Sequence, residues 1–168
     1  PAPTEGIWRG PEMTGEIVGV EIVDLDGDGQ NEIVTAFPNK ILLGSLSGGE
    51  YVGKGFIDTP DKYRLMGVDA GDLDRNGKPE LYITAVELNI GTDYEEVESM
   101  VIEEVDGQMQ IIADEIPFFF GKVDMPGEGE VIIAQSSDNK ERTYSGGVHR
   151  LTRKGKKFRT GDKIAIES

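Results

Sequence analysis

The sequence has no cysteine and a single histidine, His149, and these shortages exclude several kinds of chemistry. Without cysteine there is no disulfide framework, no thiolate zinc site and no thiol nucleophile. His149 lies in a strand-like pattern, away from any recognisable Ser–His–Asp motif, and no serine carries a nucleophile-elbow signature. The sequence therefore predicts a protein that is not an enzyme. Paired carboxylates of the kind that cleave glycosidic bonds stay open as an alternative, because acids are abundant.

Long apolar runs and positive charge are also scarce. No run approaches the roughly 18 apolar residues that a membrane span needs, and no signal peptide is visible. Acids outnumber bases by 32 to 17, which gives a net charge of −15 and argues against nucleic acid as a partner. Residues 140–168 are the exception, with nine bases against three acids. We interpret this basic end as the solvated face of a last hairpin. Docking to an acidic surface is the alternative.

Two stretches 48 residues apart share one pattern, Asp24–Glu32 and Asp72–Glu80. Each has oxygen donors at positions 1, 3, 5, 7 and 9 and glycine at position 6. Calcium takes six to eight oxygen ligands, and glycine permits the sharp turn around the ion. The sequence therefore predicts two calcium sites. The expected ligands are Asp24, Asp26, Asp28, the Gln30 carbonyl and Glu32 in the first loop, and Asp72, Asp74, Asn76, the Lys78 carbonyl and Glu80 in the second.

The residues around each loop favour strands over the helices of an EF-hand. An EF-hand needs a bidentate acid at position 12, but Thr35 and Ile83 stand there. The flanking residues 17–23, 33–36, 65–71 and 81–85 are rich in the β-branched and aromatic types that strands prefer. Each loop is therefore expected to join two strands.

Strand, loop, strand and hairpin recur with a period of about fifty residues. Hairpin turns are indicated at residues 47–49, 106–107 and 154–156. A third copy keeps the strands, but its loop has Pro126 for the position-3 acid and Ile132 at position 9. We therefore expect no calcium in the third loop. The alternative is a partial site formed by Asp124, Glu128 and Glu130. Four strands in 45–50 residues is the unit of a β-propeller blade.

The stretches Asp24–Glu32 and Asp72–Glu80, each between short apolar strands, resemble the FG-GAP/VCBS repeat family over about residues 15–165. Its members are β-propellers with calcium loops in many blades. Glu32 and Glu80 depart from the usual Asp, and the altered third loop departs further. The resemblance implies an all-β fold of four-stranded antiparallel blades. It also implies a calcium-binding, non-enzymatic scaffold that presents loops to a protein or glycan. A polysaccharide-acting enzyme, or its accessory domain, is the alternative.

We predict one repeat domain over residues 1–168. Its parts are the end of a preceding blade (1–14) and three repeats (15–64, 65–116 and 117–168). Three blades cannot close a ring, since closed propellers have four to eight. We therefore expect a partial propeller, either a fragment of a larger one or one completed by self-association through its open edges.

Three further expectations concern location and local structure. Calcium sites of extracellular modules fill only where calcium is abundant, so we predict a secreted, periplasmic or cell-surface protein. The acidic stretch 93–98 is expected to be a loop or a solvated edge. The aromatic run Phe118–Phe119–Phe120 is expected to lie in the blade core.

Overall fold

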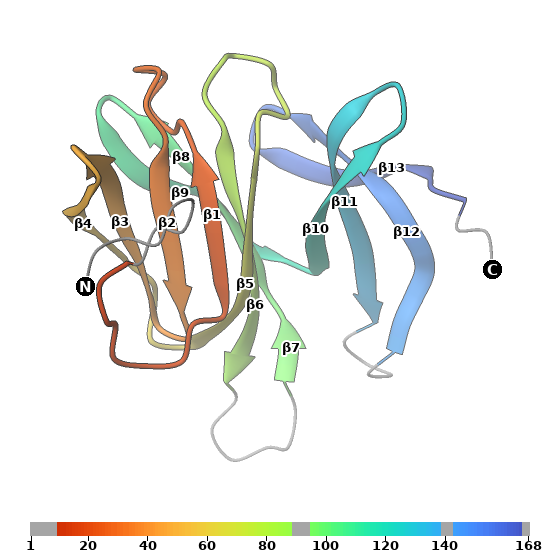
Figure 1. The fold of residues 1–168 in the computed structure, drawn as a ribbon. Helices are drawn as coiled ribbons and strands as arrows, with labels where there is room; N and C mark the ends of the chain where they lie inside the picture. The colour runs from red at the N-terminus through yellow and green to blue at the C-terminus, as the bar shows by residue number, and fades with distance from the viewer. Residues whose placement is uncertain (1–9, 89–94, 139–142, 166–168) are drawn as a thin grey trace.

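The computed structural model describes residues 10–88, 95–138 and 143–165 (Figure 1). These residues form antiparallel sheets and no helix, which confirms the all-β prediction. Three sheets follow one another along the chain, and none closes on itself. No helix that could cross a bilayer is therefore found between residues 10 and 165, outside the two internal gaps. The arrangement is consistent with a partial propeller.

Sheet A has the strand order β1-β2-β3-β4. Loop residues 24–31 join its first two strands, as predicted, and Gly48 and Gly49 form the turn between β3 and β4 at φ 60° and 85°. Positive φ favours glycine because it has no Cβ. The strands are β1 (Gly19–Val23), β2 (Glu32–Phe37), β3 (Lys40–Ser47) and β4 (Glu50–Asp58).

Sheet B repeats this order as β5-β6-β8-β9, with the short strand β7 paired to β6. Asp106 and Gly107 both have positive φ, 53° and 80°, as a tight two-residue hairpin turn requires. Within the acidic stretch 93–98, residues 93 and 94 lie outside the described residues, and Glu95–Val97 form β7. The strands are β5 (Tyr63–Gly71), β6 (Glu80–Leu88), β7 (Glu95–Val97), β8 (Ser99–Val105) and β9 (Gln108–Ile116).

Sheet C has the order β10-β11-β12-β13. Its first connection is only a tight turn, in which the Glu128 N–H donates to the Met125 carbonyl over 3.0 Å. The strands are β10 (Phe118–Met125), β11 (Gly129–Asp138), β12 (Thr143–Lys154) and β13 (Lys157–Lys163).

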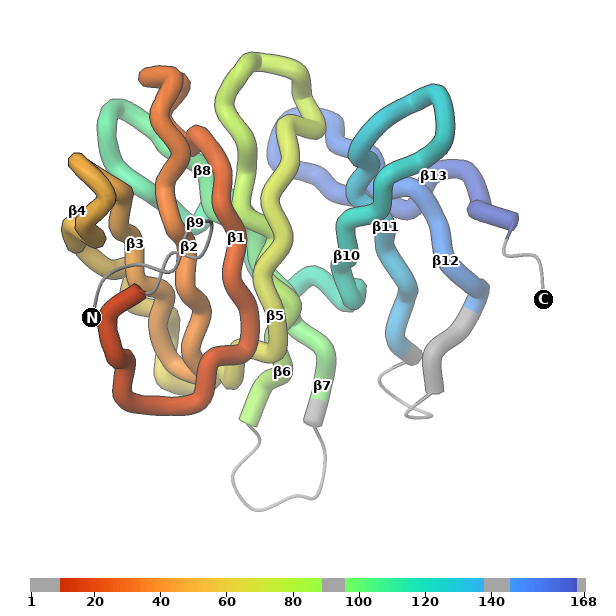
Figure 2. The backbone as a smooth tube through the Cα atoms, viewed as in Figure 1, coloured from red at the N-terminus to blue at the C-terminus, as the bar shows by residue number. Residues whose placement is uncertain are grey.

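The three sheets lie one beside the next (Figure 2). Two apolar clusters hold them together. The first lies between sheets A and B and includes Val34, Ala36, Leu81 and Ile83. The second lies between sheets B and C and consists of Tyr82, Val101, Ile116, Ile132, Ala134 and Leu151, with Phe118 and Phe120 packed against it. Because neighbouring residues of a strand point to opposite faces, sheet B can supply both clusters.

The sheets bring their first connections to one end of the molecule. The β1–β2 loop, the β5–β6 loop and the β10–β11 turn all lie at the upper end in Figure 1. The division into three repeats stays a prediction at the level of its boundaries. Of the predicted preceding-blade segment 1–14, residues 1–9 lie outside the described part of the chain.

Candidate metal-binding loops

The first loop is folded by its own aspartates. Asp24 Oδ1 accepts hydrogen bonds from the backbone N–H groups of Gly27 and Asp28, at 2.8 and 3.1 Å, and its Oδ2 accepts from Gly29 at 2.9 Å. Asp26 Oδ1 accepts from the Asp28 N–H at 3.1 Å. Such bonds from Asp to nearby N–H groups stabilise a tight turn. The carboxylates at positions 1 and 3 are therefore turned into the loop.

The second loop repeats this network. Asp72 accepts from the N–H groups of Asn76 and Gly77 at 3.0 and 2.8 Å, and Asp74 accepts from Asn76 at 3.2 Å. Asn76 Oδ1 accepts from the Lys78 N–H at 2.7 Å, as Asp28 does from Gln30 in the first loop. Corresponding positions thus have corresponding bonds, so the two loops share one backbone design.

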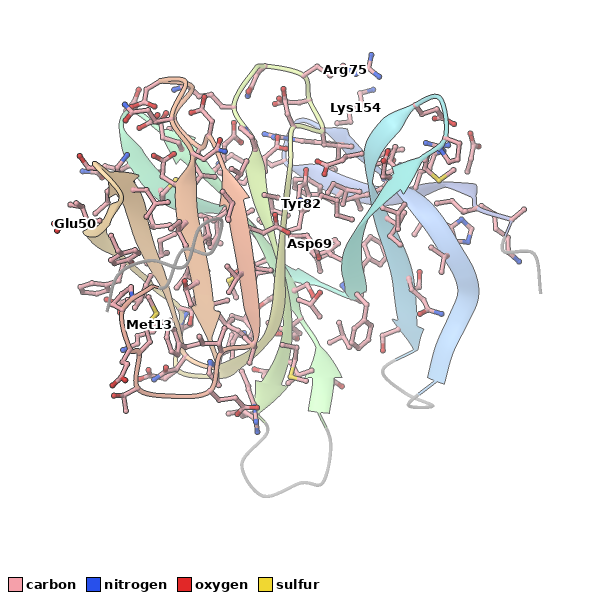
Figure 3. All side chains as sticks on the ribbon, viewed as in Figure 1. Met13, Glu50, Asp69, Arg75, Tyr82 and Lys154 are labelled. Carbon is pink, nitrogen blue, oxygen red and sulfur yellow. The ribbon has the colours of Figure 1, made fainter. Side chains whose placement is uncertain are left out.

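The loops also share their left-handed residues at positions 4 and 6. Gly27 and Gly29 have φ of 75° and 85°, and Gly77 has 87°. The remaining position is Arg75, which takes φ 61° despite its side chain. Its side chain lies at the upper end of the molecule and projects outward from it (Figure 3). A residue with a Cβ pays a conformational cost in this region.

The final acid of each loop lies at the start of the next strand, and its side chain bonds back to the beginning of the loop. Glu32 and Glu80 are 3% and 0% exposed. Their Oε2 atoms accept from the backbone N–H of Leu25 and Leu73, respectively, each at 2.9 Å. The Glu side chain is longer than that of the Asp usual at this position, and it reaches the backbone N–H at position 2 of its own loop.

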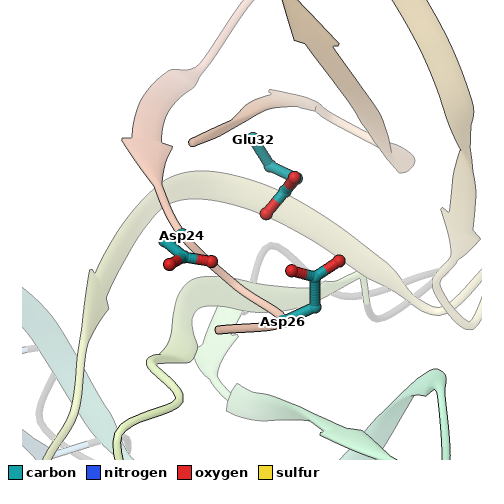
Figure 4. A group of neighbouring side chains, drawn as sticks. All are labelled: Asp24, Asp26 and Glu32. Atoms are coloured by element: carbon teal, nitrogen blue, oxygen red, sulfur yellow. The ribbon is translucent and has the colours of Figure 1, made fainter. Parts of the chain in front are cut away.

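The first loop gathers three of its five predicted ligands. One oxygen each of Asp24, Asp26 and Glu32 lies within 4.8 Å of the other two (Figure 4). Oxygens bound to one calcium ion at about 2.3–2.6 Å are at most about 5 Å apart, so these residues fit the ion. Asp28 turns instead toward Gln30, whose Nε2 donates to Asp28 Oδ2 at 3.3 Å. The ligand roles of Asp28 and Gln30 stay predictions.

The second loop gathers a different set, namely Asp74, Glu80 and Glu103. Glu103 lies on β8, and the loop pattern could not indicate it because a neighbouring strand supplies it. Asp72 and Asn76 are outside this group, although Asn76 Nδ2 donates to Glu103 Oε1 at 3.4 Å. The Lys78 side chain pairs with Glu104. The ligand roles of Asp72, Asn76 and Lys78 stay predictions.

A basic side chain from elsewhere in the chain contacts each acidic group. Lys54 Nζ lies 2.6 Å from Glu32 Oε1 and 3.9 Å from Asp26 Oδ2. In the second loop, Arg153 Nη1 pairs with Glu80 and lies 3.1 Å from Asp74 Oδ2. The Lys54 side chain is 38% exposed, whereas that of Arg153 is 12% exposed. The first loop therefore has the more easily displaced cation.

Burial governs the ionisation of the second loop. It raises the pKa of Glu80, while hydrogen bonds from the Leu73 N–H and the Tyr82 hydroxyl and the charge of Arg153 oppose that rise. Burial also raises the pKa of Tyr82, whose hydroxyl donates to Glu80 Oε2 at 2.8 Å. The Glu80 carboxylate therefore depends on its partners to stay charged.

Other acids of interest have cationic partners. In the third repeat, Glu128 Oε1 accepts from Arg150 Nη2 at 2.9 Å, and Glu130 lies 3.9 Å from Lys122 Nζ. A further group of acids lies beside β7 and consists of Glu87, Glu96 and Glu98. Lys62 Nζ lies within 3.5 Å of carboxylate oxygens of Glu87, Glu98 and the nearby Glu115. Exposed groups of this kind are common without a ligand.

Three open antiparallel sheets, each with its first two strands connected at the same end of the molecule, are consistent with a partial β-propeller. Residues 24–83 match the family model described as FG-GAP-like repeat. The match begins with the first loop and extends beyond the second, so it is consistent with the predicted FG-GAP/VCBS family and confirms that resemblance. No curated protein and no solved structure matches the chain. The repeat indicates a β-propeller-like interaction module, and such repeat domains are typically non-enzymatic scaffolds.

Proposed function

We propose that this protein is a calcium-binding β-propeller module that acts as a non-enzymatic scaffold for a protein or glycan. The observation that carries the proposal is the convergence of Asp24, Asp26 and Glu32, whose oxygens lie within 4.8 Å of one another. Hard oxygen donors at this spacing suit calcium. Magnesium is less suitable, because it demands strict octahedral geometry and keeps its water.

Each of the two loops binds one ion, and the first binds it more tightly. An ion in the first loop displaces Lys54, which is partly exposed and can move into solvent. An ion in the second loop displaces Arg153, which is held by three carboxylates. Bound calcium neutralises the clustered acids and stabilises the fold in proportion to the logarithm of its concentration above Kd.

The scaffold role rests on the common position of the connections. The two acidic loops and the β10–β11 turn lie at the same end of three rigid sheets (Figure 1). Loops fixed on a rigid framework are the usual place for a recognition surface. Calcium would set the shape of that surface by ordering two of the three connections.

The same reasoning carries the proposed location. Calcium sites of extracellular modules have Kd of about 10⁻⁴–10⁻³ M and fill only where calcium is plentiful. We therefore place the protein in a secreted, periplasmic or cell-surface setting. A Kd in that range would agree with this setting, and a submicromolar Kd would remove the argument for it.

Native mass spectrometry across a calcium titration, after treatment with a chelator, tests the metal proposal. We expect two ions per chain, with the first loop filling at lower calcium. Asp26→Ala and Asp74→Ala should each remove one ion. Asp58→Ala, at an exposed acid outside both loops, is the control. No bound ion at millimolar calcium would mean that the loops are only acidic turns.

A glycan panel tests the scaffold proposal against the enzyme alternative. The calcium-loaded protein is screened for both binding and hydrolysis. Binding without turnover supports the module. Turnover that disappears when an acid outside the loops is replaced would instead support a polysaccharide-acting enzyme.

A further inference from the structure

Sheet A exposes large apolar side chains on the face that points away from sheet B. Val20 and Ile22 on β1 are 53% and 65% exposed, and Phe56 on β4 is 64% exposed. Glu21 lies between Val20 and Ile22 on β1, so its side chain points to the opposite face of the sheet. These apolar side chains lie on the two edge strands of one sheet face, and exposed apolar side chains of this size mark an interaction surface. We call this the outer face of sheet A.

Strand register identifies the counterpart of this face in sheet B. The pairs Val20–Thr35 and Ile22–Ile33 join β1 to β2. The corresponding pairs, one repeat later, are Val68–Ile83 and Ala70–Leu81. All four of these sheet B residues are buried in the apolar cluster against sheet A. The outer face of sheet A thus corresponds to the face by which sheet B packs onto its neighbour.

Sheet C uses the same face in the same way. Its corresponding pairs are Phe120–Ala134 and Lys122–Ile132. Ile132 and Ala134 are buried against sheet B, and Phe120 packs with them. Two sheets of this chain therefore pack onto a preceding sheet with this face. The β2 row of this face on sheet A is already buried within the chain, with Ile33, Thr35 and Phe37 at 7%, 2% and 3% exposure, so only the β1 row and Phe56 stay open.

The opposite end of the stack has the complementary face. On sheet C, Val131 and Ile133 alternate with Ile132 and so point away from sheet B. Both are half-buried. In register, Ile133 corresponds to Val34 of sheet A and to Tyr82 of sheet B, which are fully buried between sheets. We call this the outer face of sheet C.

Charge also separates the two ends. Residues 19–58 hold seven acids against two bases, whereas residues 118–163 hold ten bases against six acids. An open groove of about 630 Å³ on the β12–β13 hairpin is lined by Thr152, Arg153, Lys154, Lys157 and Arg159. Opposite charges favour docking of these two ends, whereas two copies of sheet A face to face would repel.

We infer that a second copy of this chain docks the outer face of its sheet C onto the outer face of sheet A, and that two such contacts close a ring of six sheets. This contact repeats between chains the packing that joins sheets A, B and C within one chain. A head-to-tail contact that closes also leaves no open sheet face. The inference does not depend on calcium, so it and the metal proposal can fail separately.

Sedimentation or native mass spectrometry of the full chain tests the pairing. We expect the mass of two chains, falling to one chain in Ile22→Lys. Leu88→Lys changes an equally apolar exposed residue, at the far end of β6, and should leave the mass of two chains unchanged. The wild-type pair should also dissociate more readily as salt rises. A wild-type monomer throughout, or a ring of more than two chains, would overturn the proposal.

Cysteine cross-linking tests which faces meet, and the absence of native cysteine removes any background. Within the chain, a Cβ at Gly71 would lie 2.8 Å from Ile132. The position of Gly71 in sheet B is equivalent to that of Val123 in sheet C. Ile132 pairs with Lys122, and the position of Lys122 in sheet C is equivalent to that of Ile22 in sheet A. A mixture of the Ile22→Cys and Val123→Cys variants should therefore form a mixed disulfide.

Each single cysteine variant serves as the control for the other. Neither should cross-link with itself, because the two proposed partners carry different faces into the contact. A disulfide between two copies of Ile22→Cys would show that sheet A pairs with sheet A. That result would contradict the head-to-tail arrangement even if the mass were that of two chains.

Discussion

Arg153 on β12 donates a hydrogen bond from Nη1 to the fully buried carboxylate of Glu80 on β6, and so ties sheet C to the second loop. The same guanidinium reaches Glu103 on β8 at 2.8 Å through Nη2. A side chain of the third repeat thus provides the positive charge that the second acidic group needs. The pairing couples the packing of sheets B and C to the ionisation of this loop.

Replacing Arg153 with alanine should destabilise the protein strongly in the absence of calcium. Breaking a buried ion pair by removing one partner costs about 3–5 kcal/mol, because the remaining charge is left buried and unpaired. Calcium should then restore more stability to the variant than to the wild type, since the ion no longer competes with a guanidinium. Urea unfolding with and without calcium measures both effects.

Arg150→Ala is the matched control for Arg153→Ala. Arg150 lies on the same strand, but its partner Glu128 is 52% exposed. An exposed ion pair contributes about 0–1 kcal/mol, so this variant should change little. Equal calcium stabilisation of wild type and Arg153→Ala would contradict competition at the second loop.

Replacing Lys54 with methionine should strengthen calcium binding by the first loop. A unit charge at about 4 Å contributes about 1 kcal/mol in a well-solvated setting, which is roughly a fivefold change in Kd. Without calcium, the variant should be less stable, because Glu32 would lose its cation while staying buried. Titration calorimetry of the wild type and of Lys54→Met measures the affinity.

Lys40→Met controls for the loss of one positive charge from sheet A. Lys40 Nζ lies over the Phe37 ring, 5.6 Å from its centroid, and has no contact with the first loop among the interactions found in the described residues. Its calcium affinity should stay close to that of the wild type. A weaker affinity in Lys54→Met would show that Lys54 helps to shape the site.

Replacing Arg75 with glycine should stabilise the protein. Arg75 has φ 61°, where a residue with a Cβ pays about 1–2 kcal/mol and glycine pays none. Glycine loses about 0.5–1 kcal/mol of backbone entropy on folding, so the expected net gain is roughly 0.5–1 kcal/mol. Gly27→Ala, at the same position of the first loop, should lose a similar amount. Urea unfolding measures both, and Arg75→Ala separates the backbone effect from loss of the charge.

The sequence indicated the fold and the loops because both are set by local rules. Alternating apolar residues gave the strands, and the oxygen spacing located loops that fold around Asp24 and Asp72 as expected. The backbone bonds of these aspartates are made to residues three to five positions away, within reach of a pattern search.

The cations and the extra acid of the site could not be predicted in this way. Lys54, Glu103 and Arg153 reach the loops from other strands, at separations of 22 to 73 residues from their partners. No local period relates such positions. Their contacts depend on how the strands pair and how the sheets pack, which only the three-dimensional structure provides.

The first strands of the three sheets, β1, β5 and β10, also bring titratable groups together. These groups predict an effect of pH on stability. Burial, followed by the charge of Glu21, raises the pKa of Asp69 on β5, and Lys122 on β10 opposes the rise. Lys122 Nζ lies 2.7 Å from Glu21 Oε2, so its charge is already engaged. The folded state therefore holds the Asp69 proton more tightly than the unfolded state does.

Asp69→Asn should therefore stabilise the protein at neutral pH. A carboxyl with a raised folded pKa binds more protons when folded, so its contribution to stability falls as pH rises from about 3.8 through the raised value. Asparagine cannot ionise, so the advantage of the variant should grow across this window and then level off. Urea unfolding at several pH values in chelator measures it, with Asp114→Asn, at an exposed residue of β9, as the control for net charge. An advantage that is largest at low pH would show that Asp69 contributes chiefly through its pairing with Lys122.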